Sequence, residues 1–192
     1  NKSVELANQI GCQLCMSKAF SQRATTYYVK GQFDLALYDF QIGLKIDEEL
    51  NDSIGIGTGL ISIGNVFNEL NKLNEALEYY EQAYHIVCLK RDSSGLKDVL
   101  GNMGAVYIQK KDYQMALDLL TESIEYAQSE EEKGEPIQNI GAMYMEQGKY
   151  VLGGEYLEKA LLIFEKTNNR LKIANVCLAI SGNMLQLEKP EE

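Results

Sequence analysis

The sequence predicts an all-α fold, an α-solenoid built from antiparallel helix pairs. A small residue returns at Ala24, Gly64, Gly104 and Gly141, in steps of 40, 40 and 37 residues. Each of the four is followed three residues later by an aromatic residue. A fixed period of this size is typical of a solenoid. The chain also holds only two prolines, which favours helix because proline breaks helix interiors.

Within one unit, the apolar spacing predicts a helix, a tight turn and a second helix. In residues 53–90 the first stripe runs through Leu60, Gly64 and Phe67, and the second begins at Leu73. Asn71 lies between them, and Asn tolerates the left-handed conformation that ends a helix. The other units place Gly31, Lys111 and Gly148 at this turn, and Lys111 is expected to be strained or to form a different turn.

The small residues have a packing explanation. Glycines on the first helices and Ala36, Ala76, Ala116 and Gly153 on the second helices form two columns through which paired helices approach closely. A large residue there would separate the pair, at about 1–3 kcal/mol.

These residues resemble the tetratricopeptide repeat. The stretches Tyr27-x3-Gly31-x-Phe33-x2-Ala36 and Tyr144-x3-Gly148-x-Tyr150-x2-Gly153 are close variants of its template. The resemblance implies a right-handed superhelix. The usual unit has 34 residues, and the extra six are expected to lengthen the second helix and its exit turn.

In chain order, a single repeat array over residues 1–192 is predicted. Its parts are the end of a preceding repeat's second helix at 1–10, repeats at 13–50, 53–90, 93–130 and 131–167, and an unpaired or capping helix at 170–187. Ser53 and Ser93 are expected as helix N-caps, and Pro136 in a first helical turn. The chain therefore looks like an excerpt that begins and ends within a unit.

Charge and composition exclude several functions. The net charge of −10, with 18 basic against 28 acidic residues, argues against a nucleic-acid partner. The apolar stretches are shorter than the roughly 20 residues of a membrane span, so no membrane insertion is expected within this segment. The four cysteines are expected to be unpaired thiols, which favours a cytoplasmic location; an excised sensor region would instead be periplasmic.

Metal and enzyme sites are not expected. Cys12-x2-Cys15 and His85-x2-Cys88 have ligand chemistry but lie almost two units apart, too far to share a zinc ion. The glycine-rich run at 54–59 lacks the lysine and the preceding strand of a phosphate loop. With one His and no serine elbow, the sequence predicts neither a cofactor nor catalysis.

The resemblance implies a ligand groove lined by the first helices. A polar, uncharged column through this surface could hold the backbone of an extended peptide, since amides carry donors and acceptors; a merely solvated face is the alternative. Binding of chaperone C-termini is not expected, because Ser21, Thr25, Gly101 and Ala105 lie where basic residues would grip a carboxylate. The predicted groove residues are Gln22, Thr25, Tyr28, Ser62, Asn65, Asn68, Asn102, Ile108, Gln109, Gln138, Asn139 and Met145.

The predicted function is a non-catalytic module that binds a protein or an extended peptide. The 40-residue units, with strings such as those at 60–67 and 74–83, are similar to repeats that precede bacterial sensor histidine kinases and related signalling proteins. That likeness implies a sensor or regulatory region of a longer protein. The alternatives are a free-standing scaffold for complex assembly, a peptide-pheromone receptor, and self-association through exposed terminal helices.

Overall fold

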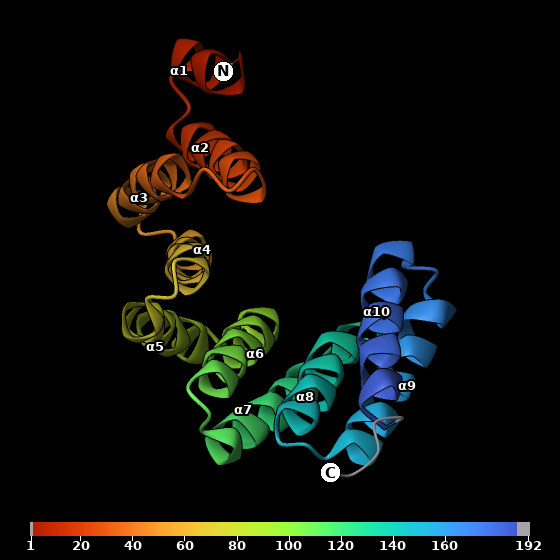
Figure 1. Ribbon diagram of the computed structural model, residues 1–192. Coiled ribbons are helices and arrows are strands. Elements are labelled where there is room, and N and C mark those ends of the chain that lie inside the picture. Colours follow the sequence, from red (N-terminus) through yellow and green to blue (C-terminus); the bar gives the residue numbers. More distant parts are fainter. Residues whose placement is uncertain (1, 188–192) are drawn as a thin grey trace. The chain divides into compact units, whose positions relative to one another are not determined.

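Helices account for nearly all of the chain in a computed structural model, which describes residues 2–187 (Figure 1). These residues form ten α-helices and one short 3-10 helix, which agrees with the predicted all-α solenoid. Within them, no helix combines the length and the apolar character needed to cross a membrane. The chain divides into two compact units, Asn1–Asn102 and Met103–Glu192, and each is described by itself.

Unit 1 is a series of helices, of which the first five pack in chain order, each on the next. They are α1 (Lys2–Ile10), α2 (Gln13–Val29), α3 (Phe33–Leu50), α4 (Ser53–Glu69), α5 (Leu73–Lys90) and the first part of α6 (Ser93–Gln109). One core cluster joins Ala24, Ala36, Phe40, Ile63 and Val66 from α2, α3 and α4. The stack from α1 to α5 runs from red to olive in Figure 1.

Unit 2 continues the same architecture with shorter helices at its start. It holds the end of α6, α7 (Tyr113–Tyr126), the 3-10 helix η1 (Glu131–Lys133), α8 (Gly134–Glu146), α9 (Tyr150–Lys166) and α10 (Arg170–Leu187). The helix α8 starts seven residues before Gly141, whereas α6 starts eleven before Gly104. Since α8 also starts 21 residues after α7, against 20 from α5 to α6, the net result is the 37-residue step. Pro136 lies in the first turn of α8, as expected.

The tight turn inside each pair is the predicted one. Gly31, Asn71, Lys111 and Gly148 all have left-handed backbones, with φ of 69°, 58°, 61° and 74°. In each case the next residue donates its N–H to the carbonyl of the repeat's aromatic residue, as Asp112 does to Tyr107 at 2.9 Å. Lys111 therefore forms the same turn, and the strain is the cost of a left-handed non-glycine residue, about 1–2 kcal/mol.

The small columns allow the close approach that the sequence predicted. A Cβ added to Gly64 would lie 2.5 Å from the Tyr80 ring, and one added to Gly104 would lie 2.7 Å from Leu120. Gly153, which replaces the usual Ala, is equally confined, because a Cβ there would lie 2.8 Å from the Met145 side chain. These glycines serve packing.

Two expectations about helix ends and lengths were wrong. The N-cap of α4 is Asp52, whose carboxylate accepts from the N–H groups of Ile54 and Gly55, so Ser53 is the first helical residue; α6 likewise begins at Ser93. The extra length is not confined to second helices. A 34-residue unit leaves about 14 or 15 residues per helix, whereas α2 and α4 have 17 and α3 and α5 have 18.

The expectation of four unpaired cysteines was also wrong. Cys12 and Cys15 form a disulfide with a Cα–Cα distance of 5.2 Å, while Cys88 and Cys177 are free and exposed. Cys12 is the N-cap of α2, and its sulfur accepts the N–H of Cys15. The pairing is local to one helical turn, which disulfide-framework spacing rules do not capture. The argument for a cytoplasmic location from unpaired thiols therefore fails.

Candidate functional site

Unit 1 carries a groove along its first helices: two cavities lie between α2 and α4, with α3 beneath them, and a third lies between α4 and the start of α6, beside α5. Three adjoining cavities of about 220, 540 and 450 Å³ share lining residues along it. Thr25 and Ser62 line both the first and the second cavity, and Thr58 and Ser62 line the second and the third. We refer to this continuous surface of unit 1 as the groove.

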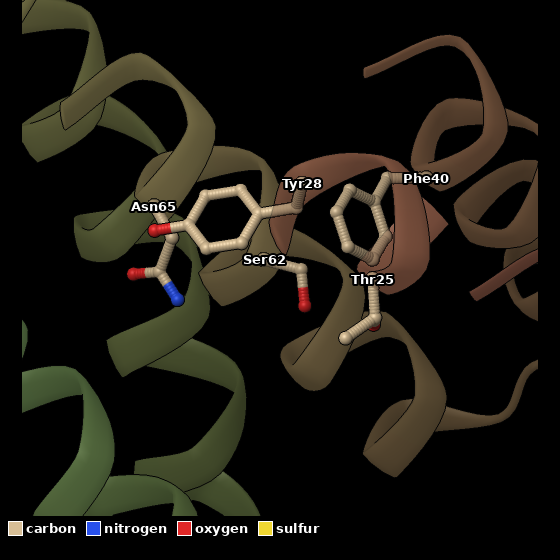
Figure 2. A pocket seen from close by; sticks show the side chains of 5 residues that line it. All are labelled: Thr25, Tyr28, Phe40, Ser62 and Asn65. Atoms are coloured by element: carbon tan, nitrogen blue, oxygen red, sulfur yellow. The ribbon is translucent and has the colours of Figure 1, made fainter. Parts of the chain in front are cut away.

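The first of these cavities, of about 220 Å³, is polar at its rim and apolar at its floor. Figure 2 shows Tyr28 and Asn65 at one end of this cavity, Phe40 and Thr25 at the other, and the Ser62 hydroxyl between them. Phe40 belongs to α3 and is 5% exposed, so it is part of the core that the cavity reaches. The hydroxyls of Thr25 and Ser62 each donate to a carbonyl one turn back, which leaves their oxygens as acceptors for a ligand.

A hydrogen-bonded cluster fixes the amide of Asn65. Its Oδ1 accepts from the Tyr80 hydroxyl at 2.6 Å and from Nδ2 of Asn102 at 3.0 Å. Tyr80 is fully buried, and this burial raises the pKa of its hydroxyl. Because the oxygen of Asn65 is engaged in two bonds, its amide nitrogen, blue in Figure 2, is the atom that can donate to a ligand.

Tyr28 forms the rim beside this cluster. Its hydroxyl donates to the Glu69 carboxylate at 3.1 Å, and its ring lies edge-on to Phe33 at a centroid distance of 5.9 Å. Burial, with a smaller contribution from the negative charge of Glu69, raises the pKa of Tyr28 to about 12. The tyrosine is therefore neutral at physiological pH and is held in place from both ends.

Carboxylates lie along the rest of the groove. Asp47 and Asp52 line the second cavity together with Lys18, and Asp92 and Asp98 line the third. Asp47 is only 4% exposed, and burial raises the pKa of its carboxyl, opposed by a hydrogen bond from Ser17. This surface therefore offers acceptors and negative charge, which favour a ligand rich in donors.

The predicted groove residues of unit 1 are brought together. Gln22, Thr25, Tyr28, Ser62 and Asn65 line the cavities, and Asn102 reaches Asn65 through its hydrogen bond. Asn68 is half-buried on α4 and lines none of the three cavities.

The predicted groove residues of unit 2 differ in their exposure to solvent. Gln109 is exposed, and Gln138 and Asn139 are half-buried on α8. Ile108 is 6% exposed and lies in a core cluster with Leu120, so its assignment to the groove was wrong, because the helix turns that position inward. Met145 is half-buried on α8 and packs against another core cluster.

The carboxylates of the second cavity and its apolar floor were not among the predicted groove residues. Asp47, Asp52 and Phe40 belong to second helices or turns, which the groove assignment did not consider. One signal was present: Asp47 occupies the place that Val87 holds forty residues later. A charge in an otherwise apolar column marks a position where a unit departs from its repeat.

Comparison with known families agrees with the helix pairs. Sequence models of the Tetratricopeptide repeat match residues 15–88 and 98–130, together more than half of the chain. The chain belongs to the tetratricopeptide repeat family. Repeats of this family form modules that bind proteins and peptides and are generally not catalytic.

Individual proteins that are similar to this chain share only a small part of its sequence or of their own length. Tetratricopeptide repeat protein 1 of Schizosaccharomyces pombe is 33% identical over 91 residues, which are 46% of this chain and 8% of that protein. The crystal structure of BtubC from P. vanneervenii has a TM-score of 0.67 at 20% identity, covering 80% of this chain and 65% of that one. A Rap protein complexed with Competence and Sporulation Factor has a TM-score of 0.71 at 15% identity, covering 92% and 55%. At these identities the structures support the fold alone.

Proposed function

We propose that the groove of unit 1 binds an extended segment of a protein or peptide that carries at least one basic side chain. The observation behind this is the pairing of a fixed amide, Asn65, with hydroxyl acceptors and carboxylates along one continuous set of cavities. A peptide backbone supplies alternating donors and acceptors for the amide and hydroxyls. A Lys or Arg side chain supplies the positive charge that Asp47 and Asp52 favour.

The chemistry of the groove distinguishes this ligand from others. Lys18 is the one basic residue among those that line the three cavities, against four aspartates. An anionic ligand would meet repulsion where these aspartates line the second and third cavities; one of them, Asp98, is already paired with Lys97 at 2.9 Å. The cavities together suit several side chains rather than one small molecule.

A selection experiment tests the proposal. Random twelve-residue peptides are displayed and selected on the intact chain, and the enriched peptides are measured by calorimetry. We expect enrichment in Lys or Arg and an affinity that falls with salt, because exposed charges are screened. The Ser62→Arg variant places bulk and positive charge in the groove and should abolish binding. Leu89→Arg is the matched control, because Leu89 is 84% exposed on α5 and lines none of the cavities.

Two results would contradict the proposal. One is the absence of any saturable peptide. The other is a set of selected peptides that bind Ser62→Arg as well as they bind the control.

Among the finer roles, we favour a peptide receptor or a regulatory region over a scaffold. A Rap protein complexed with Competence and Sporulation Factor supports this choice, as an example of the same fold in a complex. A regulatory region of a bacterial signalling protein predicts a signalling domain, such as a kinase, in the same full-length chain. Reading the complete coding sequence tests that role, and a gene that encodes repeats alone would contradict it. The absence of catalysis in this chain is part of the proposal.

A further inference from the structure

The disulfide between Cys12 and Cys15 lies at the N-terminus of α2, and the proposed peptide binding does not use it. Cys12 is the N-cap of α2, and Cys15 is an exposed residue of its first turn. The N–H group of Cys15 donates to the Cys12 sulfur at 3.2 Å. The other two cysteines, Cys88 and Cys177, are also exposed, yet they are free thiols. Cysteines in two different chemical states therefore meet solvent in this chain.

The repeat shows what occupies these two positions in the next unit. Forty residues later the N-cap is Asp52, and the residue three beyond it is Gly55. The N–H of Gly55 donates to the Asp52 carboxylate at 3.2 Å, the same length as the bond to the Cys12 sulfur. The backbone agrees as well, because Cys12 and Asp52 each donate their N–H to the carbonyl five residues earlier. The Cys12 sulfur therefore takes the place of a capping carboxylate.

The third unit shows why the two side chains meet. There the same positions are Asp92 and Gly95, and a Cβ added to the glycine would lie 2.7 Å from Oδ2 of the aspartate. A side chain at the later position is therefore directed at the capping group. In the first unit both positions carry sulfur, and their Cα–Cα distance of 5.2 Å suits a disulfide across one helical turn.

The helix does not depend on the bond between the two sulfurs. The helices α2, α4 and α6 begin at Gln13, Ser53 and Ser93, in steps of 40 residues, although the later two have an aspartate and a glycine that cannot be cross-linked. A disulfide across so short a loop also restricts the unfolded chain little, because its entropic effect grows with loop length. After reduction, a Cys12 thiolate would keep the same N–H donor, and a helix N-terminus stabilises negative charge. Both redox states therefore suit the cap of α2.

We propose that Cys12 and Cys15 form a reactive site for thiol–disulfide exchange with a low-molecular-weight thiol such as glutathione. The thiolate of the reductant attacks the sulfur of Cys15, the more exposed of the two residues, and forms a mixed disulfide with it. The bond between the two protein sulfurs breaks, and its electron pair stays on Cys12, which becomes the capping thiolate.

A second molecule of the thiol completes the reduction. Its thiolate attacks the reductant's sulfur in the mixed disulfide, the oxidised reductant is released, and the Cys15 thiolate takes a proton from water. Two electrons pass to the protein, and two thiol molecules become one disulfide. Oxidised glutathione reverses both steps: the Cys15 thiolate attacks it, and the Cys12 thiolate then displaces glutathione from Cys15.

A redox titration of the intact chain tests the proposal. The chain is equilibrated without oxygen in mixtures of reduced and oxidised glutathione, starting once from the oxidised and once from the reduced form. Free thiols are then alkylated, and mass spectrometry measures the state of each cysteine. We expect the disulfide to be almost complete in the most oxidising mixture and lost in reduced glutathione alone, with one midpoint from both directions. Circular dichroism should show the same helix content throughout.

Variants separate the exchange from folding. Cys12→Asp with Cys15→Gly copies the second unit and should keep the helix content of the parent while forming no disulfide. Cys12→Ser leaves Cys15 without its partner, so glutathione from the oxidised reagent should remain attached there, whereas in the parent Cys12 should displace it. Cys88→Ser is the matched control, because it removes a free, exposed cysteine of α5 and should leave the titration unchanged.

Three results would overturn the proposal. The first is a disulfide that survives reduced glutathione alone, because the bond would then be inert. The second is a loss of helix on reduction, which would make the disulfide a structural cross-link. The third is a parent chain that retains glutathione on Cys15 as fully as Cys12→Ser does, since the two sulfurs would then not exchange. Failure of peptide binding in the groove of unit 1 would change none of these results.

Discussion

The first two helix pairs of unit 1 share a backbone and differ in their interiors. In α4 and α5, Ile63 is fully buried and Tyr79 stacks on Phe67. Forty residues earlier, Arg23 and Asp39 occupy these positions as a two-pronged ion pair, with N–O distances of 2.6 and 2.7 Å. Asp39 is 1% exposed, and the Arg23 guanidinium lies 5.1 Å from the Phe20 ring centre. The repeat therefore specifies helix spacing and turn geometry. Either an ion pair or apolar and aromatic side chains can fill the space between the two helices.

The largest expected effect comes from breaking the ion pair on one side. Asp39→Ala removes both hydrogen bonds of a guanidinium whose side chain is 22% exposed, and it should cost about 1.5–3 kcal/mol in the free energy of unfolding, the range for hydrogen bonds to charged groups. Denaturation by urea measures it. The double variant Arg23→Ile with Asp39→Tyr copies the second pair and should recover most of the loss. A loss below about 1 kcal/mol for Asp39→Ala would mean that the pair behaves as a surface salt bridge.

Exchanging the small residues between the two pairs should destabilise both. Gly64→Ala brings a Cβ to 2.5 Å from Tyr80, and overpacking of about 1–3 kcal/mol should exceed the gain in helix propensity. Ala24→Gly should lose about 1 kcal/mol of helix propensity. The same urea titration compares them. A stabilised Gly64→Ala would show that the Tyr80 ring moves aside readily.

The hydroxyl of Tyr80 gives a smaller difference. Tyr80→Phe removes the 2.6 Å bond to Asn65 and makes the second pair resemble the first, where Phe40 holds the place. The expected loss is about 0.5–1.5 kcal/mol, because Asn65 keeps its bond from Asn102. In the first pair Thr25 stands where Asn65 stands in the second. The reverse change, Phe40→Tyr, should therefore not raise the free energy of unfolding by a matching amount. Equal effects of opposite sign would contradict this.

The smallest expected effect is a change in pH dependence. The folded pKa of Asp47 is raised by burial, so the folded state favours its protonated form. Its contribution to stability is present below the unfolded value of 3.8 and is lost as pH rises through the raised folded value. The free energy of unfolding of Asp47→Asn should therefore be higher than that of the parent at pH 7. At pH 3 the two free energies should be nearly equal. A difference that grows on acidification would contradict the assignment.

The architecture could be predicted from the sequence because it depends on local features. These are the repeat period, the left-handed turn inside each helix pair and the columns of small residues. Gly31, Asn71 and Gly148 adopt the predicted left-handed conformation. A residue with positive φ allows the chain to reverse direction in the short turn between two paired helices. Individual caps were less predictable. Asp52 and Ser53 both have capping side chains, and only the backbone geometry decides between them.

The site was predicted in part. The polar residues of α2 and α4 follow from the face of a helix, but the rotation of α6 that buries Ile108 does not follow from spacing alone. The ion pair of Arg23 with Asp39 joins residues sixteen apart, and the two charges look like ordinary surface residues in the sequence. The disulfide of Cys12 with Cys15 is too local to be distinguished from two neighbouring thiols by composition.

The order of contacts in unit 1 has a thermodynamic consequence. In unit 1 the helices from α1 to α5 pack on helices that follow one another in the chain, an arrangement in which a solenoid can melt by segments instead of in one step. The helix α1, whose packing on α2 is the sparsest between successive helices from α1 to α5, should open before the helices that follow it, and cooperativity should decay with distance along the stack. Hydrogen exchange, which reports opening residue by residue, would then show a gradient of protection from α1 towards α4.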